Sequence, residues 1–342
     1  MGNISNYYVI LTAYNEEKVI ESSFSAVKKA IDYSFKNNLT LSMVNIIFCP
    51  NGCTDGTPQI IEELKRKYSN EKIKIEVISS PKGMVIAQNA SIRFIRNIGD
   101  TNSPIFFIDT DSLIDEKVID ILIKQLERHP SLKAIGTCPI PLSYNGKSIA
   151  RKFLDRVLNC RAYFPKSEIT VRYAPEFHPY AETDPQEIGA EFEKYSKIYF
   201  HGRCFVLRNE AVWDVPENTV GEDTYLDRSI HFRFGRGSIR TMYDAKIYFY
   251  PMSTLGEFSK TFYRVYCDLR NLKHIHPERN DVREYSKTKL DWNYIRTLPI
   301  KWQFFFMTYS VVRKYYHFLF KHNLAYSGKS ALDVWSYEQK TH

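Results

Sequence analysis

Short apolar, β-prone runs alternate with helical segments along the first third of the chain. The runs cover residues 7–12, 44–49, 74–79 and 104–108, and the segments with helical spacing of apolar residues cover 16–35, 58–68 and 83–97. We expect Asn15 to cap the first of these helices. A strand, a helix and a second strand in succession form a parallel pair joined by a right-handed crossover. The alternation therefore predicts an α/β fold with a mostly parallel central sheet flanked by helices.

The fourth run ends in two carboxylates one residue apart, Asp109 and Asp111. Ligands of open α/β sheets bind at the edge where the strands end. Two carboxylates this close repel each other, so a bound cation is the natural resolution, and hard oxygen ligands suit Mg²⁺ or Mn²⁺. The motif therefore predicts a divalent-cation site. A second reading stays open at this point, in which an aspartate caps a helix expected over residues 112–128.

Composition limits the architecture and the partners. The chain has 342 residues, 44% of them hydrophobic and 15% aromatic, which predicts a large core in one big domain with appended helices. The net charge of +8 suits phosphate-bearing ligands or an anionic membrane surface. Nucleic acid is not expected as a partner, because no basic run or RNA-binding signature accompanies the aromatic residues.

Cysteine usage and hydropathy indicate the compartment. The six cysteines show no paired CxxC spacing and no leader peptide is recognisable, which predicts free thiols in a reducing compartment. We therefore expect a cytoplasmic protein, either in solution or peripheral on the inner face of the membrane. No apolar stretch is long enough to span a bilayer. The nearest, residues 300–320, is interrupted by Lys301, Gln303, Arg313, Lys314 and His317.

Five short motifs follow one another between roughly residues 5 and 230. They are residues 9–17 (VILTAYNEE), 51–57 (NGCTDGT), 109–111 (DTD), 202–208 (GRCFVLR) and 221–226 (GEDTYL). In sequence and in order they resemble the motifs of glycosyltransferase family 2, and an ordered set is far more specific than any single motif. The resemblance implies a GT-A type fold with a Rossmann-like sheet, a nucleotide-diphosphate-sugar donor, Mn²⁺ or Mg²⁺ as cofactor, and inversion at the anomeric carbon.

The resemblance also implies roles for individual residues. Those around the nucleotide sugar are Thr12, Ala13, Tyr14, Glu16, Asn51, Lys82, Asp109, Thr110 and Arg264. The metal ligands are Asp111 and Asp109, with Asp111 the more direct of the two. Asp223 is the expected general base for the acceptor hydroxyl, and Glu222 orients the acceptor or holds Asp223.

Several of these positions depart from the family or have a plainer reading. Asn51 stands where many relatives carry an aspartate that contacts the base, which weakens the expectation of uracil recognition. Arg264 lies where processive relatives place a Gln-x-x-Arg-Trp segment that is absent here. It is expected to meet the diphosphate because guanidinium groups match phosphate oxygens, and it also reads as part of a solvated helix face. Lys82 equally reads as an exposed lysine. Glu222 and Asp223 also read as helix N-terminal acids stabilised by the helix dipole.

The expected organisation is a GT-A catalytic domain over residues 1–250 and a helical, aromatic-rich extension over 251–342. Residues 1–111 form the nucleotide-binding half and residues 112–250 the acceptor half. In the stretch 138–200 four aromatic residues either stack on sugar rings or pack in the core. They are Tyr163, Phe164, Tyr173 and Tyr180.

The C-terminal segment 292–326 interleaves aromatic and basic residues. This pattern is typical of a peripheral membrane contact that presents a lipid-linked acceptor, of packing on the catalytic domain, or of a homodimer contact. The sequence leaves these three readings open.

The expected function is transfer of a sugar, with a UDP-sugar as the favoured donor, to a saccharide, lipid-linked or other hydroxyl acceptor. The setting we expect is bacterial polysaccharide, glycolipid or glycoconjugate biosynthesis. One alternative is a sugar nucleotidyltransferase, although residues 12–17 lack the glycines that such enzymes carry after the first strand. Another is a non-catalytic nucleotide-sugar or glycan-binding module, against which the presence of both Asp111 and Asp223 speaks.

Overall fold

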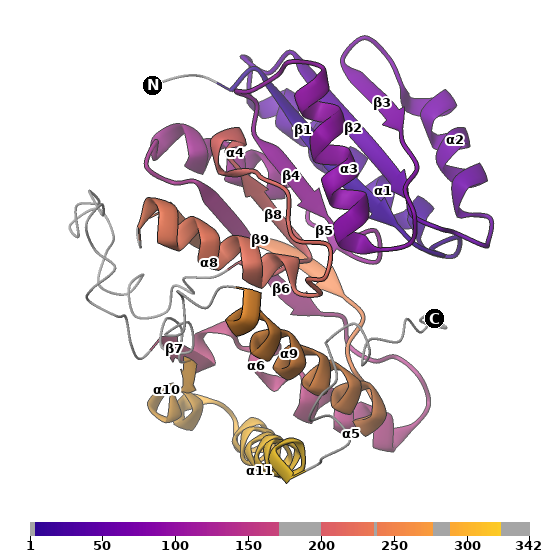
Figure 1. The fold of residues 1–342 in the computed structure, drawn as a ribbon. Coiled ribbons are helices and arrows are strands. Elements are labelled where there is room, and N and C mark those ends of the chain that lie inside the picture. The colour runs from indigo at the N-terminus through magenta and orange to yellow at the C-terminus, as the bar shows by residue number, and fades with distance from the viewer. Residues whose placement is uncertain (1–3, 171–199, 236–237, 276–287, 323–342) are drawn as a thin grey trace.

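The computed structural model describes residues 4–170, 200–235, 238–275 and 288–322, and its centre is one eight-stranded mixed sheet (Figure 1). Its strands are β1 (Asn6–Ala13), β2 (Met43–Pro50), β3 (Ile73–Val77), β4 (Ile105–Ile108), β5 (Leu113–Ile114), β6 (Ala134–Pro141), β8 (Cys204–Leu207) and β9 (Ile239–Phe249). They lie in the order β3-β2-β1-β4-β8-β6-β9-β5. Only β8 and β5 run against the other strands of this sheet. The predicted mostly parallel, helix-flanked sheet is thereby confirmed.

Helices cover both faces of the sheet, as strand residues alternate between the faces. Tyr7, Val9 and Leu11 of β1 pack with α1 (Ile20–Asn37), α2 (Thr57–Tyr68) and α4 (Val118–Arg128). Tyr8 and Ile10 of the same strand pack with α3 (Met84–Asn97) and α8 (Glu222–Phe234) on the other face. Because both faces are covered, the strands are nearly continuous apolar runs, as buried parallel strands require.

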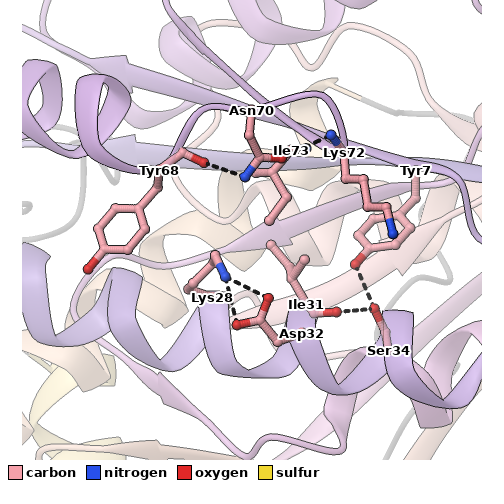
Figure 2. Close-up of polar contacts among 9 residues, drawn as sticks. All are labelled: Tyr7, Lys28, Ile31, Asp32, Ser34, Tyr68, Asn70, Lys72 and Ile73. Atoms are coloured by element: carbon pink, nitrogen blue, oxygen red, sulfur yellow. Dashed lines mark hydrogen bonds and ion pairs between the residues drawn. The ribbon is translucent and has the colours of Figure 1, made fainter.

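A buried hydroxyl on the first face is satisfied by α1. The Tyr7 side chain is fully buried, and its hydroxyl lies 3.1 Å from Ser34 Oγ (Figure 2). Because the Ser34 hydroxyl donates to the carbonyl of Ile31 at 2.7 Å, the tyrosine is the donor in the Tyr7–Ser34 bond. Burial raises the pKa of Tyr7. A buried hydroxyl left without a partner would cost about 1–3 kcal/mol, so this pair fixes α1 against β1.

The turn from α2 into β3 is built by one asparagine. The Asn70 amide nitrogen donates to the carbonyl of Tyr68, and its Oδ1 accepts from the backbone N–H of Lys72 and of Ile73 at 2.9 and 3.0 Å (Figure 2). An asparagine side chain that bonds to nearby backbone groups replaces the bonds that the ending helix loses.

A second core lies beside the sheet and is built from helices (Figure 1). These are α5 (Ile149–Leu158), α6 (Cys160–Tyr163), α9 (Leu255–Ile275), α10 (Trp292–Thr297) and α11 (Ile300–His322). A separate antiparallel pair joins β7 (Glu168–Thr170) to β10 (Thr288–Leu290). Helices from both sides of residue 250 thus share one core, and the division of the chain at that residue stays a prediction.

Two of the aromatic residues considered for sugar stacking are packed inside this second core. The Tyr163 hydroxyl lies 3.0 Å from Asp155 Oδ2, and its ring centroid lies 5.4 Å from that of Trp302. Phe164 contacts Trp302 edge-on at 4.8 Å. Tyr173, Tyr180 and residues 323–326 of the expected C-terminal segment lie outside the described residues.

The six cysteines carry free thiols, as predicted. Within the described part of the chain, no helix combines the length and the apolar character needed to cross a membrane.

Candidate functional site

The Asp-x-Asp motif lies where β4 leaves the sheet, next to the start of β8. β4 and β8 pair antiparallel, with Ile108 opposite Cys204. One residue further along, the backbone N–H of Asp109 donates to the carbonyl of Arg203 at 2.8 Å. The pairing of these strands therefore brings the motif beside residues that are far away in the sequence.

Asp111 is held by an arginine. Its Oδ1 lies 3.4 Å from Arg203 Nη1, which also lies 3.3 Å from the hydroxyl oxygen of Ser112. Both side chains of the ion pair are 20% exposed. The guanidinium carbon lies 4.3 Å from the ring centroid of Phe249, a cation–π contact that fixes its orientation. The Asp111 carboxylate is therefore already paired with a positive charge of the protein, the guanidinium of Arg203.

The alternative reading of Asp111 as a helix cap is wrong. Residues 112–128 do not form one helix, because Leu113 and Ile114 pair with β9 as β5, and α4 begins only at Val118. The N-cap position of α4 belongs to Lys117. Asp111 therefore lies in the turn between β4 and β5.

The second pair of acids begins α8. Gly221 occupies the N-cap position, and Glu222 and Asp223 are the first two residues of the helix. Asp223 Oδ2 accepts the backbone N–H of Gly202 at 2.8 Å, and its Oδ1 accepts that of Thr224 at 2.7 Å. These residues are thus helix N-terminal acids, as one reading of the sequence predicted. The position is equally compatible with a chemical role, because two N–H groups fix the direction of one carboxylate.

Gly202 lies in close contact with this carboxylate. A Cβ added to this glycine would lie 3.0 Å from Asp223 Oδ2. A side chain at this position would therefore require the carboxylate to shift by a few tenths of an ångström.

The two pairs of acids meet at one short segment of backbone. The backbone N–H of Gly202 donates to the Asp223 carboxylate. The next residue, Arg203, accepts the backbone N–H of Asp109 with its carbonyl and contacts the Asp111 carboxylate with its guanidinium. Consecutive Cα atoms are about 3.8 Å apart, so the metal motif and the Glu-Asp motif lie side by side at the β4–β8 edge. The structure thereby brings the predicted metal ligands and the predicted base together.

Glu222 is the most deeply buried of these four acids. It is 4% exposed, and burial raises its pKa well above the ordinary value, with a further increase from the negative charges of Asp223 and Asp109. The positive charge of Arg264, contributed by α9, opposes this increase in the pKa. Glu222 therefore keeps its proton at pH values where an exposed glutamate has lost it.

Asn51 ties together three elements of the nucleotide-binding half. Its backbone N–H and its side-chain amide both donate to the carbonyl of Ala13, at 2.9 and 2.8 Å, and its Oδ1 accepts the backbone N–H of Gly83 at 3.2 Å. The ends of β1 and β2 and the start of α3 are thereby joined. A contact of Asn51 with a base stays a prediction. In this structure the Asn51 side chain makes hydrogen bonds to the backbone of Ala13 and Gly83.

Lys82 and Tyr14 lie against each other in the same region. The ammonium nitrogen of the exposed Lys82 lies 4.6 Å from the centroid of the Tyr14 ring. Gly52, with φ of +64°, leaves the space that Lys82 occupies, since an added Cβ would approach the Cβ of Lys82 to 2.9 Å. Lys82 is therefore an exposed lysine, as one interpretation of the sequence predicted. A contact between Lys82 and phosphate stays a prediction.

The nucleotide-binding half is also linked directly to the Asp-x-Asp motif. The Thr110 hydroxyl, which is buried, donates to the carbonyl of Thr12 at 2.9 Å. The backbone N–H of Glu16 donates to the hydroxyl of Thr57 at 2.8 Å, which holds the loop after β1 against the start of α2. The predicted nucleotide-sugar residues therefore lie at the neighbouring ends of β1, β2 and β4 and at the start of α3. Arg264 is the exception, because it belongs to α9.

Sequence reasoning missed the contribution of Arg203 and Phe249. The motif at 202–208 was identified, but an ion pair between Arg203 and Asp111 depends on the antiparallel pairing of β8 with β4. Local periodicity carries no sign of which distant strands pair. The one available signal was a glycine–arginine pair directly before an apolar run.

Asp109 and Asp111 fit a divalent cation by the chemistry of their donors. Within residues 4–170, 200–235, 238–275 and 288–322, no three His, Cys, Asp or Glu side chains gather as a metal cage. Mg²⁺ in nucleotide sites is held by one or two carboxylates together with water and substrate phosphates, so two aspartates are a sufficient protein contribution. Arg203 already pairs with Asp111, so a bound cation would share that carboxylate with the guanidinium.

The chain matches one protein family in sequence, and solved structures are similar to it in fold. The family described as Glycosyl transferase family 2 matches residues 8–215. A search of curated proteins finds no similar sequence.

Two solved structures are similar to the chain at low sequence identity. A mannosyltransferase, PcManGT from Pyrobaculum calidifontis in complex with GDP-Man and Mn²⁺, has a TM-score of 0.51 and 15% identity, over 78% of this chain and 63% of that one. GalNAc-T7 with UDP, GalNAc and Mn²⁺ has a TM-score of 0.50 and 10% identity, over 84% of this chain and 56% of that one. The chain thus spans less than two thirds of either protein, and the likeness shows a shared GT-A fold.

Proposed function

Since the chain belongs to glycosyl transferase family 2, we propose that it transfers a sugar from a nucleotide-diphosphate donor to an acceptor hydroxyl with inversion at the anomeric carbon. The observation that carries this proposal is the meeting of Asp109 and Asp111 with Asp223 at Gly202 and Arg203. Inverting transfer needs these two chemical functions in one place: charge compensation for a leaving diphosphate and a base for the incoming hydroxyl.

Asp223 acts as the general base in this proposal. The N–H groups of Gly202 and Thr224 each hold one of its oxygens, so the direction in which the carboxylate approaches the acceptor hydroxyl is fixed. Removal of the hydroxyl proton by a positioned carboxylate contributes about a hundred- to ten-thousand-fold in rate.

Glu222 supports the base in this proposal, because it orients the acceptor or holds Asp223. Burial and the neighbouring negative charges raise its pKa, which favours the protonated form of this carboxyl group. This division of labour between neighbouring carboxyl groups follows from their different burial.

Asp109 and Asp111 would hold Mn²⁺ or Mg²⁺, which when bound offsets the negative charge that develops on the departing diphosphate. Arg264 and Lys82 are the cations we place on the phosphate oxygens. The remaining donor residues lie at the ends of β1 and β2 and beside Asp111, and we assign them to the nucleotide. They are Thr12, Ala13, Tyr14, Glu16, Asn51 and Thr110.

The two similar structures contain GDP-Man and UDP respectively, each with Mn²⁺, which supports a nucleotide-diphosphate sugar and a divalent metal as the working partners. We take a UDP-sugar as the first donor to test. The acceptor that we propose is a saccharide or lipid-linked hydroxyl compound, in the synthesis of a polysaccharide, glycolipid or glycoconjugate.

The decisive experiment incubates the protein with a panel of UDP-sugars and GDP-mannose in the presence of Mn²⁺ and measures release of the nucleoside diphosphate. We expect slow donor hydrolysis with one donor, and Asp223→Asn should lower turnover about a hundredfold or more while donor binding is retained. Asp32→Asn, on the exposed face of α1, is the matched control and should behave as the wild type (Figure 2).

Three outcomes would contradict the proposal. Pyrophosphate release from a sugar phosphate and a nucleoside triphosphate would indicate a nucleotidyltransferase. Binding of a nucleotide sugar without turnover would indicate a binding module. Once an acceptor is known, a product that retains the anomeric configuration of the donor, measured by NMR, would refute inversion.

A further inference from the structure

The outward face of α11 is apolar along its whole length. The exposed apolar side chains on this helix recur every three or four residues, which places them on one face. They are Ile300 (77% exposed), Phe304 (51%), Met307 (50%), Val311 (68%), Tyr315 (56%) and Phe318 (59%).

This stripe is distinct from the face with which α11 packs on the protein. The opposite side of α11 contributes Phe306 and Tyr309 to the second core, with Trp302, Tyr316 and Phe320 packed at its edge. The helix therefore already has a core-facing side, and packing against the part of the chain that the structure describes does not account for the second apolar side.

The apolar surface continues from α11 onto α5. Ile149 is 84% exposed and Phe153 is 39% exposed, and they lie one helical turn apart. The Phe153 ring lies 6.4 Å from that of Phe304 and 5.7 Å from that of Phe305. We call this two-helix surface the docking surface, made up of Ile149, Phe153, Ile300, Phe304, Met307, Val311, Tyr315 and Phe318.

Within the described residues, the exposed charged side chains of α5 and α11 are all basic. The 23 residues of α11 include four lysines and arginines and no aspartate or glutamate. One of these four, Arg313, lies toward the core-facing side of the helix and is only partly exposed. The exposed basic residues on or next to the two helices are Lys147, Arg151, Lys152, Lys301, Lys314 and Lys321.

We propose that the docking surface binds the anionic surface of a lipid bilayer, with α11 lying in the plane of the interface. An apolar face that carries phenylalanine and tyrosine and is bordered by lysine is typical of interfacial helices. The surface extends over two neighbouring helices, α11 and α5, and this breadth suits a planar partner.

Self-association is disfavoured by the same charges. A two-fold dimer apposes one patch to its own copy, so the basic residues of the two protomers would face each other across an apolar contact. An anionic bilayer instead supplies the opposite charge, together with an apolar layer below the headgroups. The charge pattern therefore selects the bilayer as the occupant.

The test is sedimentation of the full chain with vesicles. Vesicles of phosphatidylcholine with about 30 mol% phosphatidylglycerol should bind the protein, pure phosphatidylcholine vesicles should bind it far less, and added salt should weaken binding. The variant Met307→Gln/Val311→Gln/Phe318→Gln should lower the partition coefficient about tenfold or more. Because all three positions are exposed, this variant should fold normally, as circular dichroism would verify.

The matched control places the same type of substitution elsewhere on the surface. Leu39→Gln/Ile98→Gln changes two side chains that are 96% and 55% exposed, and it should bind vesicles as the wild type does. A charge variant, Lys301→Gln/Lys314→Gln/Lys321→Gln, should lose binding to the anionic vesicles about a hundredfold.

Equal vesicle binding by the triple-glutamine variant and its control would overturn the proposal. So would a wild type that ignores both kinds of vesicle and instead forms a concentration-dependent dimer, measured by light scattering, that the Met307/Val311/Phe318 variant abolishes. Donor hydrolysis without acceptor or vesicles should be unchanged in the docking variants, so this test is separate from that of the catalytic proposal.

Discussion

Glu222 illustrates how position alone separates two neighbouring acids. It follows Gly221 directly at the start of α8, and it is buried, whereas the adjacent Asp223 is half-buried and accepts backbone N–H groups. The sequence predicted both as acids of one site, and it also indicated their place at a helix N-terminus. Which of the two keeps its proton depends on burial, and burial is a property of the packed molecule.

The raised pKa of Glu222 predicts a pH-dependent stability. Below the ordinary glutamate pKa both the folded and the unfolded chain carry this proton. As the pH rises further, the unfolded chain loses the proton while the folded chain retains it, so the free energy of unfolding falls, by at most about 1.4 kcal/mol per pH unit. Glu222→Gln should therefore lose less stability than the wild type between pH 5 and pH 8.

Urea denaturation at both pH values measures this difference. Asp227, which burial also affects in the same direction, is present in both proteins and cancels in the comparison. An identical change in stability for the variant and the wild type would show that Glu222 ionises freely in the folded state.

Asp111 provides the residue-scale test of the metal assignment. Asp111→Asn removes a carboxylate charge and should weaken Mn²⁺-dependent binding of the nucleotide diphosphate about tenfold or more, measured by calorimetry. The wild type in EDTA is the matched reference, because it should bind as weakly as the variant does. Unchanged affinity of the variant in Mn²⁺ would remove Asp111 from the metal site.

At the scale of elements, local periodicity predicted the four N-terminal strands, because β1, β2 and β4 are largely buried apolar runs and β3 alternates buried apolar with exposed charged residues. It did not predict β5, whose two residues are a strand only because they pair with β9, more than a hundred residues away. Asn15 was expected to cap α1, but α1 begins at Ile20, and the Asn15 side chain instead accepts the backbone N–H of Thr54 at 2.8 Å. Both errors have the same cause, a contact with a distant segment that outweighs the local preference.

The loop before β8 supplies the element-scale prediction. Gly202→Ala places a Cβ 3.0 Å from Asp223 Oδ2, so the carboxylate must shift by a few tenths of an ångström or more. We expect turnover to fall about ten- to a hundredfold with little change in donor binding, because misplacement of a reacting group lowers the rate more than the affinity.

Gly256→Ala is the control for this substitution. It adds the same methyl group at the start of α9, where the nearest atom would lie 3.9 Å away. Equal turnover in the two variants would show that the Gly202–Asp223 contact does not position the base.

At the scale of the whole molecule, the chain has a sheet-centred core and a helical core, and the latter was only partly foreseeable. The aromatic density of the C-terminal segment indicated a packed or interfacial helix. That α11 packs on α5 and α6, from before residue 250, depends on how the chain folds back and is absent from any local pattern.

Phe306 tests the contribution of this helical core. It is fully buried, and Phe306→Ala should lower the free energy of unfolding by about 3–5 kcal/mol. Phe304→Ala is the matched control two residues earlier, where the ring is 51% exposed, and it should cost much less. Similar losses in the two variants, measured by denaturation followed by circular dichroism, would mean that this core adds little to the stability of the fold.

The helix α9 belongs to two environments at once. Its 21 residues include Phe258 and Phe262, which contact Tyr316 of α11, and Arg264, whose positive charge opposes the rise in the pKa of Glu222. A substitution that displaced α9 would therefore disturb the helical core and the electrostatic environment of Glu222 at the same time.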